Sequence, residues 1–194
     1  MKRFGLTLGV VLVLALVLAL PAPSLAQGPK VAASLKAGVM QRLGTDCDIT
    51  IEYSRPGVKG LKIWGDLVPY GMNPGNKYSK DKPYPWRAGA NENTTIEFKK
   101  DVLVEGKPLP AGKYGLHMIP GEKEWTIIFS KNNSAWGSFT YNQDEDALRV
   151  TVMPVKAPHQ EWLMFGFDDL AGTSATAFLH WEQLKVPFKI QVAK

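Results

Sequence analysis

Hydrophobic and polar residues alternate with a period of two along much of the chain. Ile49, Ile51 and Tyr53, for example, are separated by the polar residues Thr50 and Glu52. This alternation is typical of half-buried β-strands, with one face in a core and the other toward water. We predict strands over 48–53, 94–98, 102–104, 113–119, 124–130, 148–153, 177–182 and 186–192. Segment 31–42 fits either a strand or a helix, and we favour a strand.

Turn-forming residues separate these strands. Glu105-Gly106-Lys107, Pro120–Lys123 and Ala171–Thr173 have the composition of tight turns, and the chain contains 18 Gly and 14 Pro. No long helical period and no internal repeat is present in the sequence. The pattern therefore predicts an all-β fold, an antiparallel β-sandwich or jelly-roll-like single domain.

The first 26 residues have the pattern of a signal peptide. Met1-Lys2-Arg3 is basic, residues 4–20 carry no charge, and small residues follow at Ser24 and Ala26. The alternative is an uncleaved membrane anchor, because the apolar run approaches the roughly 20 residues of a spanning helix. We predict cleavage after Ala26 and a β-sandwich domain over 27–194. The protein would then be periplasmic or extracellular, with no integral membrane segment after cleavage.

Composition and charge exclude several classes of protein. The 45% hydrophobic and 21% charged content is that of a globular chain and excludes a disordered one. Loss of Lys2 and Arg3 with the signal peptide would lower the net charge from +5 to +3, which is too weak to predict nucleic-acid binding. The single cysteine, Cys47, excludes an intrachain disulfide framework. We interpret Cys47 as a passive thiol, and pairing between chains is left open.

The alternation stops between residues 53 and 95. The segment combines basic residues with tryptophans and tyrosines. Its basic residues are Arg55, Lys59, Lys62, Lys77, Lys80, Lys82 and Arg87. A connection of this length without regular structure is uncommon in a compact domain, and it usually has a function or covers a sheet edge.

Four blocks of sequence resemble one known family. They are YSRPGVKG at 53–60, LVPYG at 67–71, WRAGANENT at 86–94 and LPAGKYGL at 109–116. The blocks are similar to a family of secreted bacterial proteins that is known only as a domain of unknown function, and the resemblance runs from about Ser34 to Ile190. It implies a bacterial source and export, and it implies no known reaction. Residues 72–85 lengthen the connection between the second and third blocks, and the role of this loop is left open.

The same segment supplies most of a candidate ligand-binding site. Arginine offers a planar fork for carboxylate, phosphate or sulfate, while carboxylate and amide groups bind hydroxyls, and aromatic rings offer flat apolar surfaces. We predict non-catalytic binding of a polar or anionic small molecule or glycan at the cell envelope. The predicted site residues are Arg55, Lys59, Trp64, Tyr70, Trp86, Arg87, Asn91, Glu92 and His117.

Three alternatives stay open. Arg87 and Glu92 could instead form a buried ion pair with a purely structural role. A hydrolase of envelope carbohydrate could use Glu92 or His117 together with Arg87. A structural or partner-binding module could use the 72–85 loop. No G-x-S-x-G, H-E-x-x-H or calcium-loop motif is present, so we predict neither a metal site nor a cofactor, and we make no prediction of oligomeric state.

Overall fold

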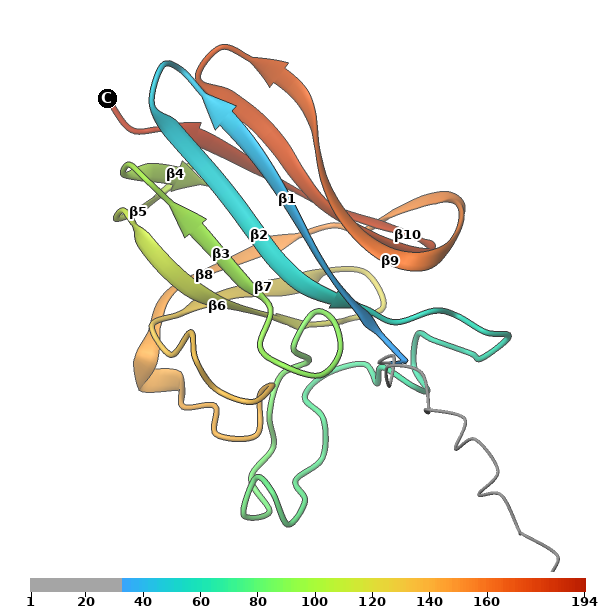
Figure 1. Ribbon diagram of the computed structural model, residues 1–194. Helices are drawn as coiled ribbons and strands as arrows, with labels where there is room; N and C mark the ends of the chain where they lie inside the picture. Colours follow the sequence, from blue (N-terminus) through green and yellow to red (C-terminus); the bar gives the residue numbers. More distant parts are fainter. Residues whose placement is uncertain (1–32) are drawn as a thin grey trace, which may run out of the picture. The chain divides into compact units, whose positions relative to one another are not determined.

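The computed structural model describes residues 33–194, which form two antiparallel sheets packed as a sandwich (Figure 1). The larger sheet has the order β1-β2-β3-β6-β7-β8. Its strands are β1 (Leu35–Leu43), β2 (Cys47–Arg55), β3 (Thr95–Phe98), β6 (Gly112–Ile119), β7 (Trp125–Ser130) and β8 (Asp146–Val152). The smaller sheet has the order β5-β4-β10-β9. Its strands are β4 (Val102–Val104), β5 (Lys107–Leu109), β9 (Val155–Ala171) and β10 (Ser174–Val192). The predicted all-β sandwich is confirmed, while the predicted signal peptide lies outside the described residues.

The core lies between the two sheets and is built by the alternation that the sequence shows. Ile49 and Ile51 of β2 are fully buried, as are Phe188 and Ile190 of β10. The rings of Phe129 in the larger sheet and Phe188 in the smaller one are 6.3 Å apart. Burial of each such side chain contributes about 1.5–3 kcal/mol, so these alternating positions hold the sheets together.

The end of the chain differs from the prediction. Residues 177–182 and 186–192 belong to one strand, β10, and β9 was not predicted at all. The prolines explain both errors. Pro158 lies in β9, which is an edge strand, and Pro187 lies between the part of β10 that pairs with β9 and the part that pairs with β4. Proline is tolerated at both places because neither requires its missing N–H.

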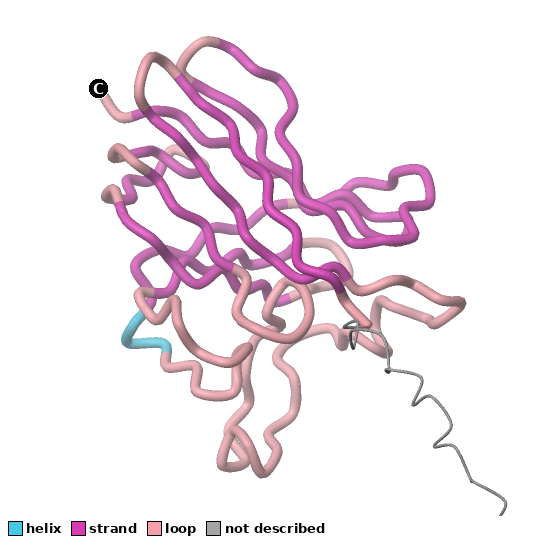
Figure 2. The backbone as a smooth tube through the Cα atoms, in the orientation of Figure 1, coloured by secondary structure: helices cyan, strands magenta, loops and turns pink. Residues whose placement is uncertain are grey.

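The segment between β2 and β3 is irregular, as predicted. Residues 56–94 contain isolated bridges and no strand, and Figure 2 shows their loops gathered at one end of the sandwich with the connection between β7 and β8. The bridge between Trp86 and Met118 fastens the segment to β6. Within residues 33–194, the only helical element is η1 (Gln143–Glu145), and no helix is long and apolar enough to cross a membrane.

Candidate functional site

A cavity of about 600 Å³ lies on the face of the larger sheet that points away from the core. Its floor is formed by outward-facing residues of neighbouring strands, because Gly38 pairs with Glu52, and Glu52 pairs in turn with Thr95. Its outer walls come from the connection between β7 and β8 and from the residues just before β3. The lining residues are Lys36, Ala37, Gly38, Glu52, Tyr53, Ser54, Glu92, Asn93, Thr95, Lys113, Asn133, Ser134, Ala135 and Trp136.

The charged groups of the cavity are paired. The Lys36 ammonium is 3.2 Å from Glu92, and the Lys113 ammonium is 2.8 Å from Glu52. The hydrogen bond from Lys113 holds the pKa of Glu52 below its usual value. The pKa of Glu92 is also lowered, mainly by a backbone N–H and further by Lys36 and Ser54. The lining therefore contains two cations and two carboxylates, and it is neutral overall near pH 7.

Neutral polar groups and one exposed indole complete the lining. The side chain of Trp136 is 62% exposed, although indoles are usually well buried. Ser54 donates to Glu92 over 3.3 Å, and the amide N–H of Asn93 donates to the Asn132 carbonyl over 3.1 Å. The other amide atom of Asn93, Oδ1, is buried without a hydrogen-bond partner among the described residues. The cavity thus combines a flat apolar surface with hydroxyl, amide and carboxylate groups.

Of the nine predicted site residues, the structure places only Glu92 in the lining of this cavity. Trp64 and Trp86 instead pack in the core with Trp125 and Trp181. The Trp64 and Trp125 rings are 4.9 Å apart, and Trp86 stacks on Trp181 at 6.1 Å. These two predicted residues therefore stabilise the end of the core, which covers the flat faces that a ligand would need.

Arg55, at the end of β2, does not line the cavity, and neither do Lys59 and Tyr70 of the irregular segment. Arg55 Nε donates to the Leu163 carbonyl over 2.8 Å, which fastens the end of β2 to β9. The backbone N–H of Lys59 donates to Glu161 over 2.8 Å, and its ammonium lies 5.5 Å from the centre of the Trp162 ring. Tyr70 is 43% exposed and does not line the cavity.

Arg87, Asn91 and His117 are not among the lining residues of the cavity. Arg87 donates to the Asn91 carbonyl, and its guanidinium lies 4.8 Å from the centre of the Phe139 ring. The expected alternative of an Arg87–Glu92 ion pair is wrong, because Glu92 pairs with Lys36. Asn91 Nδ2 donates to the Ser34 carbonyl over 3.1 Å. Asn91 therefore ties the irregular segment to the residue just before β1.

His117 is buried at 3% exposure, and its Nδ1 is 2.8 Å from Ser138 Oγ. Burial, with a further contribution from the positive charge of Arg87, lowers the pKa of His117 to about 4. The imidazole is therefore neutral at pH 7. Because it is enclosed, it supports the connection between β7 and β8 and does not reach a ligand in the cavity.

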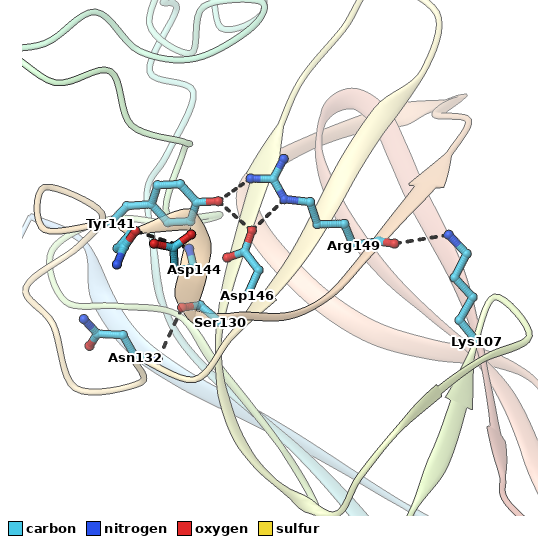
Figure 3. A network of polar contacts seen from close by, with 8 residues as sticks. Lys107, Ser130, Asn132, Tyr141, Asp144, Asp146 and Arg149 are labelled. Carbon is cyan, nitrogen blue, oxygen red and sulfur yellow. Dashed lines mark hydrogen bonds and ion pairs between the residues drawn. The ribbon is translucent and has the colours of Figure 1, made fainter.

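A second polar network holds the connection between β7 and β8 at the end where β8 begins (Figure 3). Tyr141 donates to Asp146 Oδ2 over 2.6 Å, and Arg149 Nε donates to the same oxygen over 2.6 Å. Burial, followed by the hydrogen bond with Asp146, raises the pKa of Tyr141 to about 12. Together with His117–Ser138, this network holds the part of the loop that follows Trp136. The part before Trp136 is held by hydrogen bonds from Asn93 to the Asn132 carbonyl and from Asn133 to the Lys113 carbonyl.

The prediction from sequence missed most of the cavity. Lys36, Glu52 and Lys113 occupy outward positions of strands, where polar residues are the rule. Such residues indicate a solvent-exposed face of a sheet, and they do not indicate which strands are neighbours in that sheet. The one usable signal was Trp136, a large aromatic residue between the polar residues Asn133, Ser134 and Ser138.

The described residues contain no group of three or more His, Cys, Asp or Glu side chains that could hold a metal ion. In comparisons with known proteins, residues 34–190 match the sequence model of DUF2911, described as a protein of unknown function. No curated protein and no solved structure gives a significant match.

Proposed function

The chain belongs to the DUF2911 family, and we propose that it is a non-catalytic binding protein for a polar, hydroxyl-rich small molecule or glycan. The cavity that contains Trp136 and Glu92 is its binding site. Its volume of about 600 Å³ lies within the range of roughly 300–1,000 Å³ that is usual for small-molecule sites. The exposed Trp136 indole, on the rim of a lining rich in hydroxyl, amide and carboxylate groups, is the observation that carries this proposal.

The lining favours a neutral ligand over an anionic one. Lys36 and Lys113 are each paired with a carboxylate, so little positive charge is left to attract an anion. The carboxylates of Glu52 and Glu92 can accept hydrogen bonds from hydroxyl groups, while Asn133 offers both a donor and an acceptor. The C–H face of a sugar ring is apolar and matches the flat indole of Trp136. A neutral saccharide satisfies both kinds of surface.

A carbohydrate hydrolase is the second candidate, because two carboxylates, those of Glu52 and Glu92, line one cavity as glycoside hydrolysis requires. Such an enzyme needs one carboxyl group that is protonated near neutral pH. The pKa of Glu52 and that of Glu92 are both lowered, so both groups are ionised. His117 and Arg87, the other candidates for catalysis, are not among the lining residues. Binding without catalysis is therefore the better-supported function.

Binding is tested by isothermal titration calorimetry, in which the protein is titrated with neutral oligosaccharides of glucose and of N-acetylglucosamine. Trp136→Ala should abolish binding of any saccharide that the protein recognises and should leave the melting temperature unchanged, because the indole is largely exposed. Tyr70→Ala is the matched control, since Tyr70 is an exposed aromatic residue outside the cavity. Loss of binding in the Tyr70 variant alone would contradict the assignment to this cavity.

We also propose that the protein acts in the cell envelope after export. The basic start, the uncharged run and the Ser24-Leu25-Ala26 site support cleavage after Ala26. The mass of the protein recovered from the envelope should correspond to a chain that begins at Gln27. A mass that includes residues 1–26 would favour the membrane-anchor alternative.

A further inference from the structure

The loop of residues 72–85 is a cationic protrusion with an aromatic residue near its tip. Lys77, Lys80 and Lys82 are all exposed, and Asp81 is the single acidic residue, so the loop has a net charge of +2. The side chain of Tyr78 is 64% exposed. Figure 1 shows this loop projecting from the end of the sandwich where the irregular segments gather. None of its residues lines the 600 Å³ cavity.

Internal hydrogen bonds give the loop a defined shape. The backbones of Asn73 and Tyr84 pair through bonds of 2.8 and 3.2 Å, which close its base. At the tip, Asn76 Oδ1 accepts hydrogen bonds from the backbone N–H groups of Tyr78 and Ser79, at 2.8 and 3.2 Å. The exposed lysines are therefore held on an ordered backbone, and little conformational entropy of the main chain is lost when a partner binds.

The loop is also attached to the body of the protein. The rings of Tyr78 and Tyr84 contact Phe139 with centroids 5.5 and 5.1 Å apart. Phe139 belongs to the connection between β7 and β8 that also carries Trp136. A partner bound to the loop would consequently lie beside the cavity wall.

We propose that the 72–85 loop docks on an anionic phospholipid surface. Each lysine near such a surface strengthens binding by about fivefold, and tyrosine favours the headgroup region because its ring is apolar and its hydroxyl is polar. The protruding shape suits a broad, flat partner better than a single acidic chain, which would need a groove. With a net charge of only +2, the attachment is weak, reversible and sensitive to salt. It does not depend on which ligand occupies the cavity.

The test uses the chain 27–194 in sedimentation with vesicles of phosphatidylcholine, with and without phosphatidylglycerol. The chain should bind the vesicles that contain phosphatidylglycerol, should not bind phosphatidylcholine alone, and should dissociate at high salt. Lys77→Gln with Lys82→Gln should weaken binding by roughly 30-fold, because two lysines are lost. Tyr78→Ser should weaken it by a further few-fold. The lysine side chains are exposed, so the melting temperature of the lysine variant should be unchanged. Tyr78→Ser also removes a ring contact with Phe139 and should lower the melting temperature slightly.

Lys107→Gln with Lys189→Gln is the charge-matched control. Both lysines are exposed, and they lie on β5 and β10 of the smaller sheet, outside the irregular segment. This variant should bind nearly as well as the parent chain. Equal loss in both double variants would show that only total charge matters and would overturn the proposal. Two other results would also overturn it. One is displacement of the protein from the vesicles by free glycerol phosphate. The other is lysine-dependent binding to a soluble acidic polysaccharide that is tighter than binding to the vesicles and is unaffected by Tyr78→Ser.

Discussion

The buried histidine predicts how stability depends on pH. His117 has a pKa of about 4 in the folded protein, against 6.5 for an ordinary histidine. Below pH 6.5 the unfolded chain binds a proton at this position, while the folded protein does not. The free energy of unfolding must therefore fall as the pH decreases from 6.5 toward 4, and this contribution is fully present only above pH 6.5. The loss amounts to about 2 kcal/mol at pH 5 and about 3 kcal/mol below pH 4.

The measurement is urea unfolding followed by tryptophan fluorescence, with the parent chain and His117→Gln compared at pH 7, 6, 5.5 and 5. The variant should be less stable at pH 7, because packing around the ring is lost, but its stability should change by about 2 kcal/mol less between pH 7 and 5. His159→Gln, at an exposed histidine of β9, is the control that removes one imidazole from the protein without changing the packing around His117. The reasoning is refuted if the parent chain and His117→Gln lose equal stability over this interval.

Three further predictions concern the loop that carries Trp136 and the lone thiol. Gly137 has a positive φ of 65°, and a Cβ there would lie 2.3 Å from the Arg87 guanidinium carbon. Gly137→Ala should therefore lower the free energy of unfolding by about 1–3 kcal/mol and weaken saccharide binding. The control is Gly106→Ala, where φ is 76° and the space around the Cβ is open; this change should cost less stability and leave binding unchanged. Tyr141→Phe removes a donor from the Asp146 carboxylate and should lower the free energy of unfolding by about 1–3 kcal/mol in urea; no measurable change would contradict the role of the network. Cys47 is fully buried, and burial raises its pKa, so Ellman's reagent should label it only after unfolding; rapid labelling of the folded protein would contradict this.

The sequence predicted most of the sandwich because side chains on a strand alternate between core and solvent. Ile96 and Phe98 of β3 are buried as their spacing predicts, and so are Leu179 and Trp181 of β10. The pattern failed over β9, where Lys156, Pro158 and His159 interrupt the apolar positions. An edge strand that is paired on one side only can tolerate such residues, and sequence alone does not show which strand lies at an edge.

The sequence predicted the candidate site less well than the fold. It directed attention to residues 53–95, where Arg55 proved to fasten the end of β2 to β9, and Trp64 and Trp86 proved to fasten the irregular segment to the core. Glu92 is the predicted residue that lines the cavity, while Glu52 and Lys113 pair across 61 positions of the chain. The unusual content of basic and aromatic residues in this segment therefore reflects the many side-chain contacts that hold it in place.

The sequence by itself determined the all-β class, the irregular connection between β2 and β3, and the family, because these depend on local periodicity and on residues close together in the chain. Only the tertiary structure decided where the cavity lies. Strand order brings Lys36, Glu52 and Lys113 to one face, and the loop that carries Trp136 folds over them. Strand pairing depends on contacts between distant residues, and a polar residue that faces solvent has the same pattern whether it lines a binding site or an open surface.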